Sequence, residues 1–290
     1  MKHERPAYLV VLIGALWLLT AGCSQNRVAN SAWLASLPKP WVLSAEQVTQ
    51  LLPEFRKHYP DFHQRLKAVA LWRVGTPYEL YRLGEEVEPD PDPIFRLDVS
   101  DCTAHILTSL CLAQSSSWSE ARHNMIAIHY KPDAAGNMTP SYRSRWHYTT
   151  DRITANPSTV DITPSLLPPE ELATVDITLN RKADGSEFLD LDWSRELTAR
   201  YIPSAKISAE LLARLPAVCG VTFVKKSYFK LGLVVAHEGM IIDRQDLIHA
   251  GLAAGETERT DFLKYYFAEQ GPLFDGIMVF AFVPLAEQAG

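Results

Sequence analysis

The chain has 290 residues, with 28 Lys and Arg against 34 Asp and Glu, and a formal net charge of −6 at pH 7. A surface that binds nucleic acid is basic, so this charge argues against DNA or RNA as a partner. Hydrophobic residues make up 47% of the composition, which is enough for one large domain with a buried core.

Residues 1–22 have the three parts of a secretory signal peptide. Basic residues precede an apolar run over residues 7–19, which is shorter than the ~20 apolar residues of a membrane span. Small residues follow, and Ala21-Gly22-Cys23 resembles the lipobox of bacterial lipoproteins. The resemblance implies cleavage before Cys23, lipidation of that cysteine and a membrane anchor in the cell envelope, which we expect at the outer membrane facing the periplasm. An uncleaved anchor is the alternative.

The number of cysteines predicts a free thiol. If Cys23 carries lipid, three cysteines remain in the exported chain, namely Cys102, Cys111 and Cys219, and three cannot all pair. Exported compartments favour disulfides, so an unpaired thiol there fits a catalytic role. Cys111 lies within an apolar helical pattern and Cys219 beside a predicted core strand, so we expect both to be buried as small hydrophobic residues.

The domain organisation follows from changes in composition along the chain. Residues 23–40 form a polar tether, and residues 41–290 are long enough for one folded domain. A segment over about 131–216 separates the cysteine-bearing helix from the histidine-bearing strands, and we interpret it as an insertion that carries much of the specificity.

The first part of the domain is predicted to be helical. Ser44 and Gln47 form a capping-box pattern that begins a helix over 44–63. Apolar residues at helical spacing predict two further helices, over 61–72 and 100–113, with Ser100 able to cap the second. The acidic, proline-rich stretch between them is expected to be a loop.

The second part is predicted to be rich in strands. Residues 124–130 are either a strand or the end of a helix, and residues 208–215 fit a short helix. Apolar stretches bounded by turn residues predict strands over 175–179, 188–191, 220–225, 231–242, 247–250 and 276–284. Helices followed by an antiparallel run of strands indicate an α+β fold.

Cys102 stands at the start of a predicted helix. Unpaired backbone N–H groups and the helix dipole stabilise a thiolate at that position, and a nearby histidine can serve as its base. An inert core cysteine is the alternative, and the position at a helix start favours the catalytic interpretation.

Two histidines lie twelve residues apart in a strand–turn–strand pattern. Side chains alternate between the faces of a strand, so His237 and His249 share a face only if the turn has an odd number of residues or the hairpin contains a bulge. In that geometry His237 would be the general base for Cys102, and His249 would orient it. The alternatives are two unrelated structural histidines or a zinc site, but no CxxC or HExxH pattern supports zinc. We expect neither a metal nor a cofactor.

Several motifs resemble a known superfamily. His237-Glu-Gly-Met-Ile-Ile followed by Leu-Ile-His249-Ala resembles the two-histidine segment of NlpC-type, papain-like cell-wall peptidases. Three further motifs look like the N-acetylmuramoyl-L-alanine amidase-like branch: Gly75-Thr-Pro-Tyr-Glu-Leu-Tyr-Arg-Leu-Gly84, Leu97-Asp-Val-Ser-Asp-Cys-Thr103 and Arg143-Ser-Arg-Trp-His-Tyr148. The resemblance covers roughly residues 71–250 and implies a papain-like α+β fold with N-terminal helices packed on an antiparallel sheet or barrel.

The resemblance also implies an activity and site residues. The activity is hydrolysis of the amide between N-acetylmuramic acid and L-alanine in peptidoglycan or muropeptides, with catalytic Cys102, His237 and His249. Tyr78 would line the oxyanion side of the site. Arg143, Arg145 and Trp146 are candidates for contacts with sugar or peptide, because arginine suits carboxylates and an indole suits a sugar ring; an ordinary surface patch is the alternative.

The chain departs from the family pattern at three positions. Leu107 stands where an acidic residue is usual, His105 replaces an apolar residue, and Glu238 replaces a valine. Strand alternation places Glu238 on the sheet face opposite to His237. These departures leave two other functions open: a stem-peptide endopeptidase of the same fold, and a catalytically inactive lipoprotein that binds peptidoglycan.

Overall fold

The structure is a computed structural model that describes residues 28–287 and divides the chain into two units, residues 1–38 and residues 39–290. In the first unit, residues 28–36 are helical. The predicted signal peptide and Cys23 lie outside the described residues. Among residues 28–287, no helix is both long enough and apolar enough to span a bilayer.

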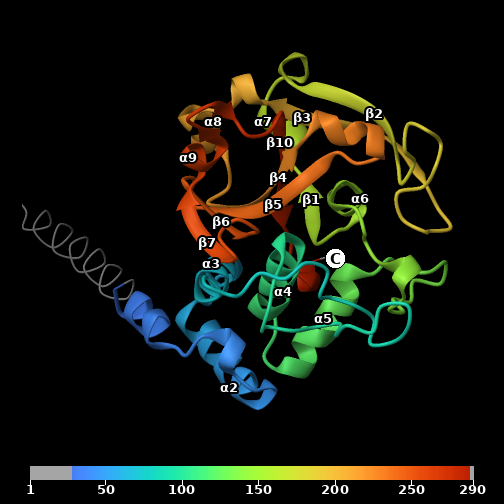
Figure 1. Cartoon of the computed structure of the whole chain (residues 1–290). Helices are drawn as coiled ribbons and strands as arrows, with labels where there is room; N and C mark the ends of the chain where they lie inside the picture. Colours follow the sequence, from blue (N-terminus) through green and yellow to red (C-terminus); the bar gives the residue numbers. More distant parts are fainter. Residues whose placement is uncertain (1–27, 288–290) are drawn as a thin grey trace, which may run out of the picture. The chain divides into compact units, whose positions relative to one another are not determined.

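Helices make up the first part of the second unit, as the sequence predicts (Figure 1). Four of them lie together on one side of the sheet: α2 (Ala45–His58), α3 (Phe62–Trp72), α4 (Cys102–Ala113) and α5 (Trp118–His129). The capping box is confirmed, because the Ser44 side chain accepts from the Gln47 backbone and the Gln47 side chain accepts from Ser44. Of residues 124–130, left open between strand and helix end, residues 124–129 complete α5 and Tyr130 is its C-cap.

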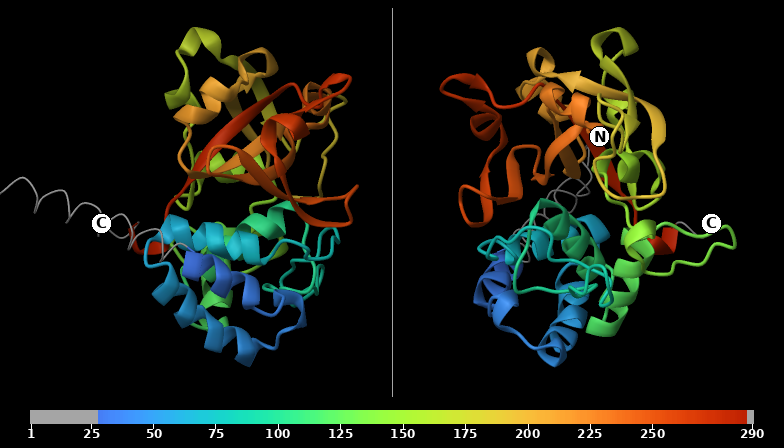
Figure 2. Two further views of the ribbon diagram at one scale, coloured as in Figure 1. Left: turned by 90° about the vertical axis from the view of Figure 1, so that its left-hand side faces the viewer. Right: turned by 45° about the vertical axis from the view of Figure 1, so that its right-hand side comes forward.

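An antiparallel sheet of eight strands forms the other layer, which confirms the α+β class (Figure 2). Seven strands pair in the order β2-β3-β10-β4-β5-β6-β7, and β1 pairs with β10. Their bounds are β1 Thr159–Asp161, β2 Ala173–Leu179, β3 Arg195–Pro203, β4 Val218–Val224, β5 Val235–Ile242, β6 Asp246–Gly251, β7 Glu256–Asp261 and β10 Gly276–Phe282.

Shorter elements connect these strands. A separate two-stranded sheet is formed by β8 (Phe267–Ala268) and β9 (Gly271–Pro272). The remaining α-helices are α6 Thr149–Ala155, α7 Thr163–Leu166, α8 Ala209–Arg214 and α9 Phe262–Tyr266. The 3₁₀ turns are η1 Pro40–Val42, η2 Tyr142–Ser144, η3 Pro169–Glu171, η4 Ser204–Lys206, η5 Lys226–Leu231 and η6 Leu285–Glu287. The segment 131–216 thus supplies three strands of the main sheet and belongs to the same compact unit.

The two faces of the sheet are covered differently. On one face, apolar side chains of the central strands pack with those of α8 and α9 in a buried cluster that includes Phe223, Ile241 and Phe262. On the other side, α3 contacts β4, α4 contacts β5 and β6, and α6 contacts β1. Burial of this apolar surface on both faces is the main favourable term in folding.

Two sequence predictions of strands and caps are wrong. Residues 188–191 form no strand, because Asn180 binds the backbone N–H groups of Phe188 and Leu189 and holds them in a loop. The partner of β2 is β3, in which exposed and buried residues alternate. Several of the exposed residues are charged, so the segment shows no apolar pattern that would predict a strand. The cap of α4 is Asp101, one residue after the predicted Ser100.

A buried ion pair joins three elements around the start of α4. The Arg152 guanidinium of α6 pairs with the Glu238 carboxylate of β5, and both side chains are almost fully buried. Glu238 also accepts hydrogen bonds from the hydroxyls of Thr103 on α4, at 2.6 Å, and Thr149 on α6, at 3.1 Å. The sheet face expected for Glu238 is therefore occupied by a hydrogen-bonded cluster that fixes α4 and α6 against β5.

Removal of one partner from this pair should destabilise the protein strongly. We expect Arg152→Met to lower the free energy of unfolding by about 3–5 kcal/mol, because it leaves the Glu238 carboxylate buried and unpaired. Urea unfolding followed by circular dichroism measures the change. The double variant Arg152→Met/Glu238→Met should recover much of the loss, whereas breaking the exposed pair with Glu54→Gln should cost less than about 1 kcal/mol. A cost for Arg152→Met as small as that of Glu54→Gln would contradict the prediction.

Candidate active site

Cys102 is the first residue of α4, as the sequence predicts. Asp101 caps the helix, with its carboxylate accepting from the backbone N–H of Ala104 at 2.8 Å. Cys102 is partly exposed, whereas Cys111 and Cys219 are buried, and all three thiols are free. These burials agree with the assignment of Cys111 and Cys219 to the core, and Cys102 is the partly exposed cysteine of the described residues.

The thiol of Cys102 lies against the strand that carries His237. It accepts a hydrogen bond from the backbone N–H of Glu238, the next residue along β5. That N–H is available because the pairing of β5 with β6 extends only over Met240–Ile242. Burial, together with the carboxylates of Asp101 and Glu238, raises the pKa of the Cys102 thiol to about 12. The thiol is therefore protonated at neutral pH in the ligand-free protein.

The β5–β6 hairpin brings the two histidines together. Its strands pair Ile242 with Asp246, so the turn has three residues, which is the odd length that places His237 and His249 on one face. His237 Nε2 and His249 Nδ1 lie 3.0 Å apart, within hydrogen-bonding distance. Since Nε2 of His237 is engaged in this way, Nδ1 is the ring nitrogen that remains to act on a thiol.

Gly239 makes this close approach possible. Continuing the register of the hairpin places Gly239 opposite His249. A Cβ atom at Gly239 would lie 3.0 Å from Cβ of His249 and 2.9 Å from the backbone oxygen of Ile248. The absence of a side chain between the two histidines therefore lets β6 lie close enough for the rings to meet.

Aromatic residues surround the two imidazoles. Phe223 of β4 stacks on His237 with ring centroids 5.5 Å apart and an interplanar angle of 18°. Tyr265 of α9 lies 4.5 Å from His249 and 6.4 Å from His237, measured between ring centroids. Burial lowers the pKa of His237 to about 4 and, with the neighbouring His237, that of His249 to about 3. Both imidazoles are neutral near pH 7, so either can accept a proton.

Tyr78 lies beside Cys102. The backbone of Tyr78 forms an isolated parallel β-bridge with Ser100, which lies two residues before Cys102. Burial and the neighbouring Cys102 raise the pKa of the Tyr78 hydroxyl to about 12, so this hydroxyl is a hydrogen-bond donor at neutral pH. The structure thus brings Tyr78 to the cysteine, on a different element from the histidines.

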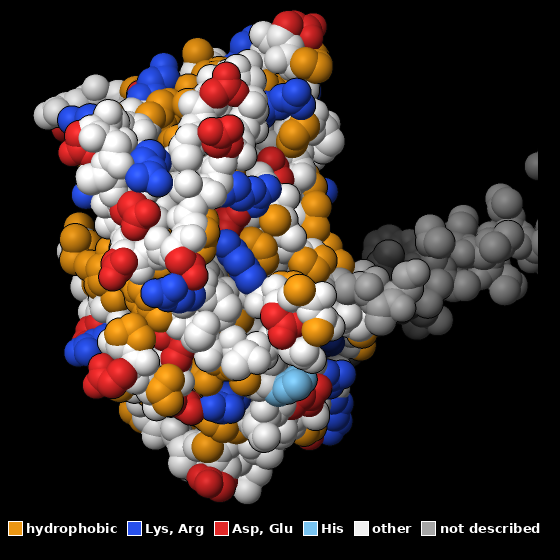
Figure 3. Space-filling model, turned by 90° about the vertical axis from the view of Figure 1, so that its right-hand side faces the viewer, with side chains coloured by type: hydrophobic (Ala, Val, Ile, Leu, Met, Phe, Trp, Pro, Cys, Tyr) orange, Lys and Arg blue, Asp and Glu red, His pale blue; other side chains and the backbone are white. Residues whose placement is uncertain are grey.

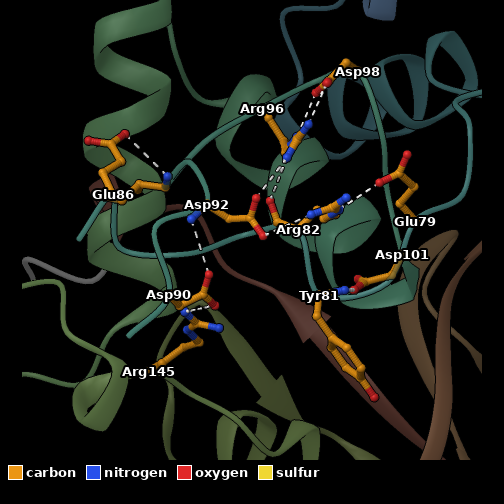
Figure 4. A network of polar contacts seen from close by, with 11 residues as sticks. Glu79, Tyr81, Arg82, Glu86, Asp90, Asp92, Arg96, Asp98, Asp101 and Arg145 are labelled. Carbon is orange, nitrogen blue, oxygen red and sulfur yellow. Dashed lines mark hydrogen bonds and ion pairs between the residues drawn. The ribbon is translucent and has the colours of Figure 1, made fainter. Parts of the chain in front are cut away.

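The loop after Tyr78 is tied to the cap of α4 (Figure 4). The backbone N–H of Tyr81 donates to Asp101 at 3.0 Å, and Tyr81 has a positive φ of 58° that is uncommon for a bulky residue. Tyr81 is 78% exposed. Ion pairs of Arg82 with Glu79 and of Arg96 with Asp98 hold the loop around it. Asp101 therefore fixes both the start of α4 and an exposed aromatic ring.

The predicted substrate residues Arg143, Arg145 and Trp146 are placed differently from one another. Arg145 is buried, and its guanidinium pairs with Glu85 at 2.5 Å and with Asp90 at 2.9 Å. Trp146 is buried as well. Both side chains pack within the domain in this structure, so a contact of either with substrate stays a prediction.

Arg143 is exposed and lies at a surface cavity. It pairs with Asp192 at 2.8 Å, and the cavity, of about 530 Å³, is also lined by Lys131 and Trp193. Figure 3 shows the right-hand side of the molecule as drawn in Figure 1. Acidic and basic side chains are interspersed on this side. Neither Cys102 nor either histidine lines this cavity, so the structure does not join Arg143 to them.

The family departures His105 and Leu107 are both buried on α4. Neither ring nitrogen of His105 has a hydrogen-bond partner among residues 28–287, and burial holds the pKa of His105 well below its usual value. Neither residue thus adds a charge near Cys102. Within the described part of the chain, no group of three or more histidine, cysteine or acidic residues could hold a metal ion.

Comparison with known proteins assigns the family. The model of the AmiA-like family, described as N-acetylmuramoyl-L-alanine amidase-like, matches residues 68–269, which is more than half of the chain. The chain belongs to this family. None of the curated proteins is detectably similar to the chain in sequence.

Solved structures share the fold of this AmiA-like chain at low identity. A protein of Legionella pneumophila matches with a TM-score of 0.67 and 19% identity, over 83% of this chain and 94% of its own. An N-acetylmuramoyl-L-alanine amidase of Bacteroides uniformis matches with a TM-score of 0.60 and 18% identity, over 77% and 99%. A candidate xylanase of Bacteroides fragilis matches with a TM-score of 0.56 and 22% identity, over 73% and 98%.

Sequence reasoning missed three residues that contact the histidines. Phe223 stacks on His237, the ring of Tyr265 lies tilted against His249, and Glu258 of β7 lies 3.4 Å from Nε2 of His249. Phe223 occupies an ordinary core position of a predicted strand, and Glu258 lies on an edge strand without an apolar pattern. Only the pairing of the strands brings these residues to the site.

The raised thiol pKa predicts how Cys102 reacts with an alkylating agent. Because the thiolate is the nucleophile, the rate with iodoacetamide should rise about tenfold per pH unit between pH 7 and pH 9, without a plateau. Intact-mass spectrometry measures the rate, and Cys102→Ala should remove this pH-dependent labelling. A plateau below pH 8 would instead indicate a thiolate–imidazolium pair in the free protein.

Buried neutral histidines predict a loss of stability in mild acid. Burial lowers the pKa of five histidines, so the unfolded chain binds more protons than the folded one below about pH 6.5. The free energy of unfolding should therefore fall as the pH drops from 6.5 towards 4. The five residues are His105, His129, His147, His237 and His249.

Urea unfolding at several pH values measures this dependence. His147→Gln should make the fall in stability shallower, because burial lowers the pKa of His147 to about 4. His123→Gln, which changes an exposed histidine, should leave it as in the wild type. A flat stability between pH 6.5 and pH 4.5 in the wild type would contradict the assignment.

Proposed function

We propose that the chain is a cysteine amidase of the bacterial cell envelope, anchored by lipid on Cys23, that hydrolyses the amide between N-acetylmuramic acid and L-alanine in peptidoglycan or its fragments. The observation that carries the proposal is that the thiol of Cys102, at the start of α4, accepts from the backbone N–H of Glu238, the residue next to His237, whose ring lies 3.0 Å from that of His249 between Nε2 and Nδ1, in a chain of the AmiA-like family. The order of these residues in the chain and the helix-on-sheet arrangement support the papain-like, NlpC-type assignment.

The first chemical step is attack of the Cys102 sulfur on the lactyl carbonyl carbon. His237 takes the thiol proton at Nδ1 as the S–C bond forms, because its Nε2 is engaged with His249. A protonated thiol and a neutral imidazole suit transfer of the proton during the attack. The developing oxyanion accepts hydrogen bonds from the backbone N–H of Cys102 and from the Tyr78 hydroxyl.

Collapse of this intermediate breaks the C–N bond. His237 gives its proton to the nitrogen of L-alanine, and the stem peptide leaves as an amine. Water, deprotonated by His237, then attacks the muramoyl thioester, which releases the carboxylic acid and restores the thiol. These reaction steps use only side chains and backbone groups of this chain, the substrate and water.

The surroundings of the thiol fit a sugar-bearing substrate. The exposed ring of Tyr81 lies next to the cap of α4, and its proximity contributes to the raised pKa of Tyr78. An exposed aromatic face of this kind can stack on a pyranose ring. We assign Tyr81 to contact with the muramoyl sugar. The stem peptide would then bind on the opposite side of the thiol.

Product analysis tests the proposal. The mature chain should release intact stem peptide from purified muropeptides, and Cys102→Ala should lower the rate by at least about 10³-fold, because the nucleophile is lost. Mass spectrometry identifies the products, and Cys111→Ala, which changes another cysteine of the same helix, should keep most of the activity. Cleavage within the stem would move the reaction to an endopeptidase. Binding of fragments without cleavage by the wild type would indicate a receptor and overturn the proposal.

A further inference from the structure

Glu258 lies directly across from His249 in the sheet. The two residues are register partners in the antiparallel pair of β6 and β7, so their side chains share a face. Oε1 of Glu258 lies 3.4 Å from Nε2 of His249. The His249 side chain is 2% exposed and that of Glu258 is 39% exposed, so the carboxylate reaches a buried ring from the edge of the site.

The contact between the histidines determines which tautomer of His249 can assist a reaction. Once His237 holds a proton on each ring nitrogen, its Nε2–H must donate to Nδ1 of His249. Nδ1 of His249 must then carry a lone pair, so the proton of this ring must be on Nε2. A proton on Nε2 needs an acceptor. Within the described residues, Nε2 of His249 is buried and makes no hydrogen bond of normal geometry. The Glu258 carboxylate, 3.4 Å from Nε2, is placed to accept it.

Gly251 leaves the space that this carboxylate occupies. Gly251 follows His249 by two residues on β6, so a side chain there would lie on the same face. A Cβ atom at Gly251 would lie 2.8 Å from Oε1 of Glu258 and 3.3 Å from Cε1 of His249. The lack of a side chain at this position thus keeps the carboxylate beside the imidazole.

Among the described residues, four other groups surround His249, and one of them, the backbone of Ala250, also accepts a hydrogen bond from its ring. They are His237 of β5, Tyr265 of α9, His105 of α4 and the backbone of Ala250. Among these neighbours and Glu258, only Glu258 carries a negative charge, which also favours positive charge on the histidine pair.

We propose that Glu258 is a positioning residue of the active site, which holds His249 as the Nε2–H tautomer and so makes His249 Nδ1 the acceptor for His237. The inference rests on the proposed function, because it extends the Cys102–His237–His249 arrangement by one member. Glu258 itself touches no reacting atom. Its effect reaches the reaction through His249 and His237, so its loss should reduce the rate of the chemical step and leave substrate binding unchanged.

Four variants of the mature chain test this proposal with muropeptide as substrate. Glu258→Ala and Glu258→Gln should lower kcat by roughly tenfold, the lower end of what loss of an orienting partner of an imidazole costs at metal sites, with KM unchanged within about twofold. Gly251→Ala should lower kcat in the same way, because it displaces the carboxylate while keeping its charge. Glu256→Gln, which removes an exposed carboxylate two residues earlier on β7, should retain the kcat of the wild type.

A second measurement reads the tautomer without turnover. Nitrogen-15 NMR of the histidines should show the Nε2–H form of His249 in the wild type and a mixture of tautomers in Glu258→Ala. The same Nε2–H form in both proteins, or an unchanged kcat in both Glu258 variants, would overturn the role of Glu258. If Cys102→Ala kept its activity, the proposed function would fail instead, and the NMR result would still decide the role of Glu258.

Discussion

The arrangement of the site depends on how the first turn of α4 is held against β5. The buried carboxylate of Glu238 binds Thr103 of α4 and the Arg152 guanidinium of α6, while the backbone N–H of the same residue donates to the Cys102 thiol. One residue of β5 therefore places the helix, and its neighbour His237 projects towards the other face. Without this ion pair, a buried charge would stand unpaired directly behind the thiol.

This packing has an electrostatic consequence for the chemistry. The carboxylates that fix α4, Asp101 and Glu238, also disfavour a thiolate, and burial disfavours protonated imidazoles. The helix N-terminus alone would have suggested an activated thiolate. The structure instead combines a neutral thiol with a neutral base, so the site develops charge only as the reaction proceeds. A carboxylate at the far side of His249, supplied by Glu258, is placed where it would favour the charge that then forms on the histidines.

The sequence predicted the elements that depend on local patterns. The capping box of Ser44 and Gln47, the helix that begins at Cys102 and the hairpin strands of the two histidines all follow from residues close together in the chain. The strand β3 and the edge strand β7 escaped notice, because exposed charged side chains replace the apolar pattern on which prediction relies. The condition of an odd turn was deduced from strand alternation, and the structure met it with a turn of three residues.

The sequence by itself therefore determined the α+β class and the helix start at Cys102, because each depends on the periodicity of single segments, and it set the condition under which His237 and His249 share a face. Only the tertiary structure decided what surrounds them. Tyr265, Glu258 and Arg152 reach the site from α9, β7 and α6, and Arg145 is drawn into an internal ion pair. Contacts between residues so far apart in the chain are set by sheet order and helix packing, which no local pattern of residues encodes.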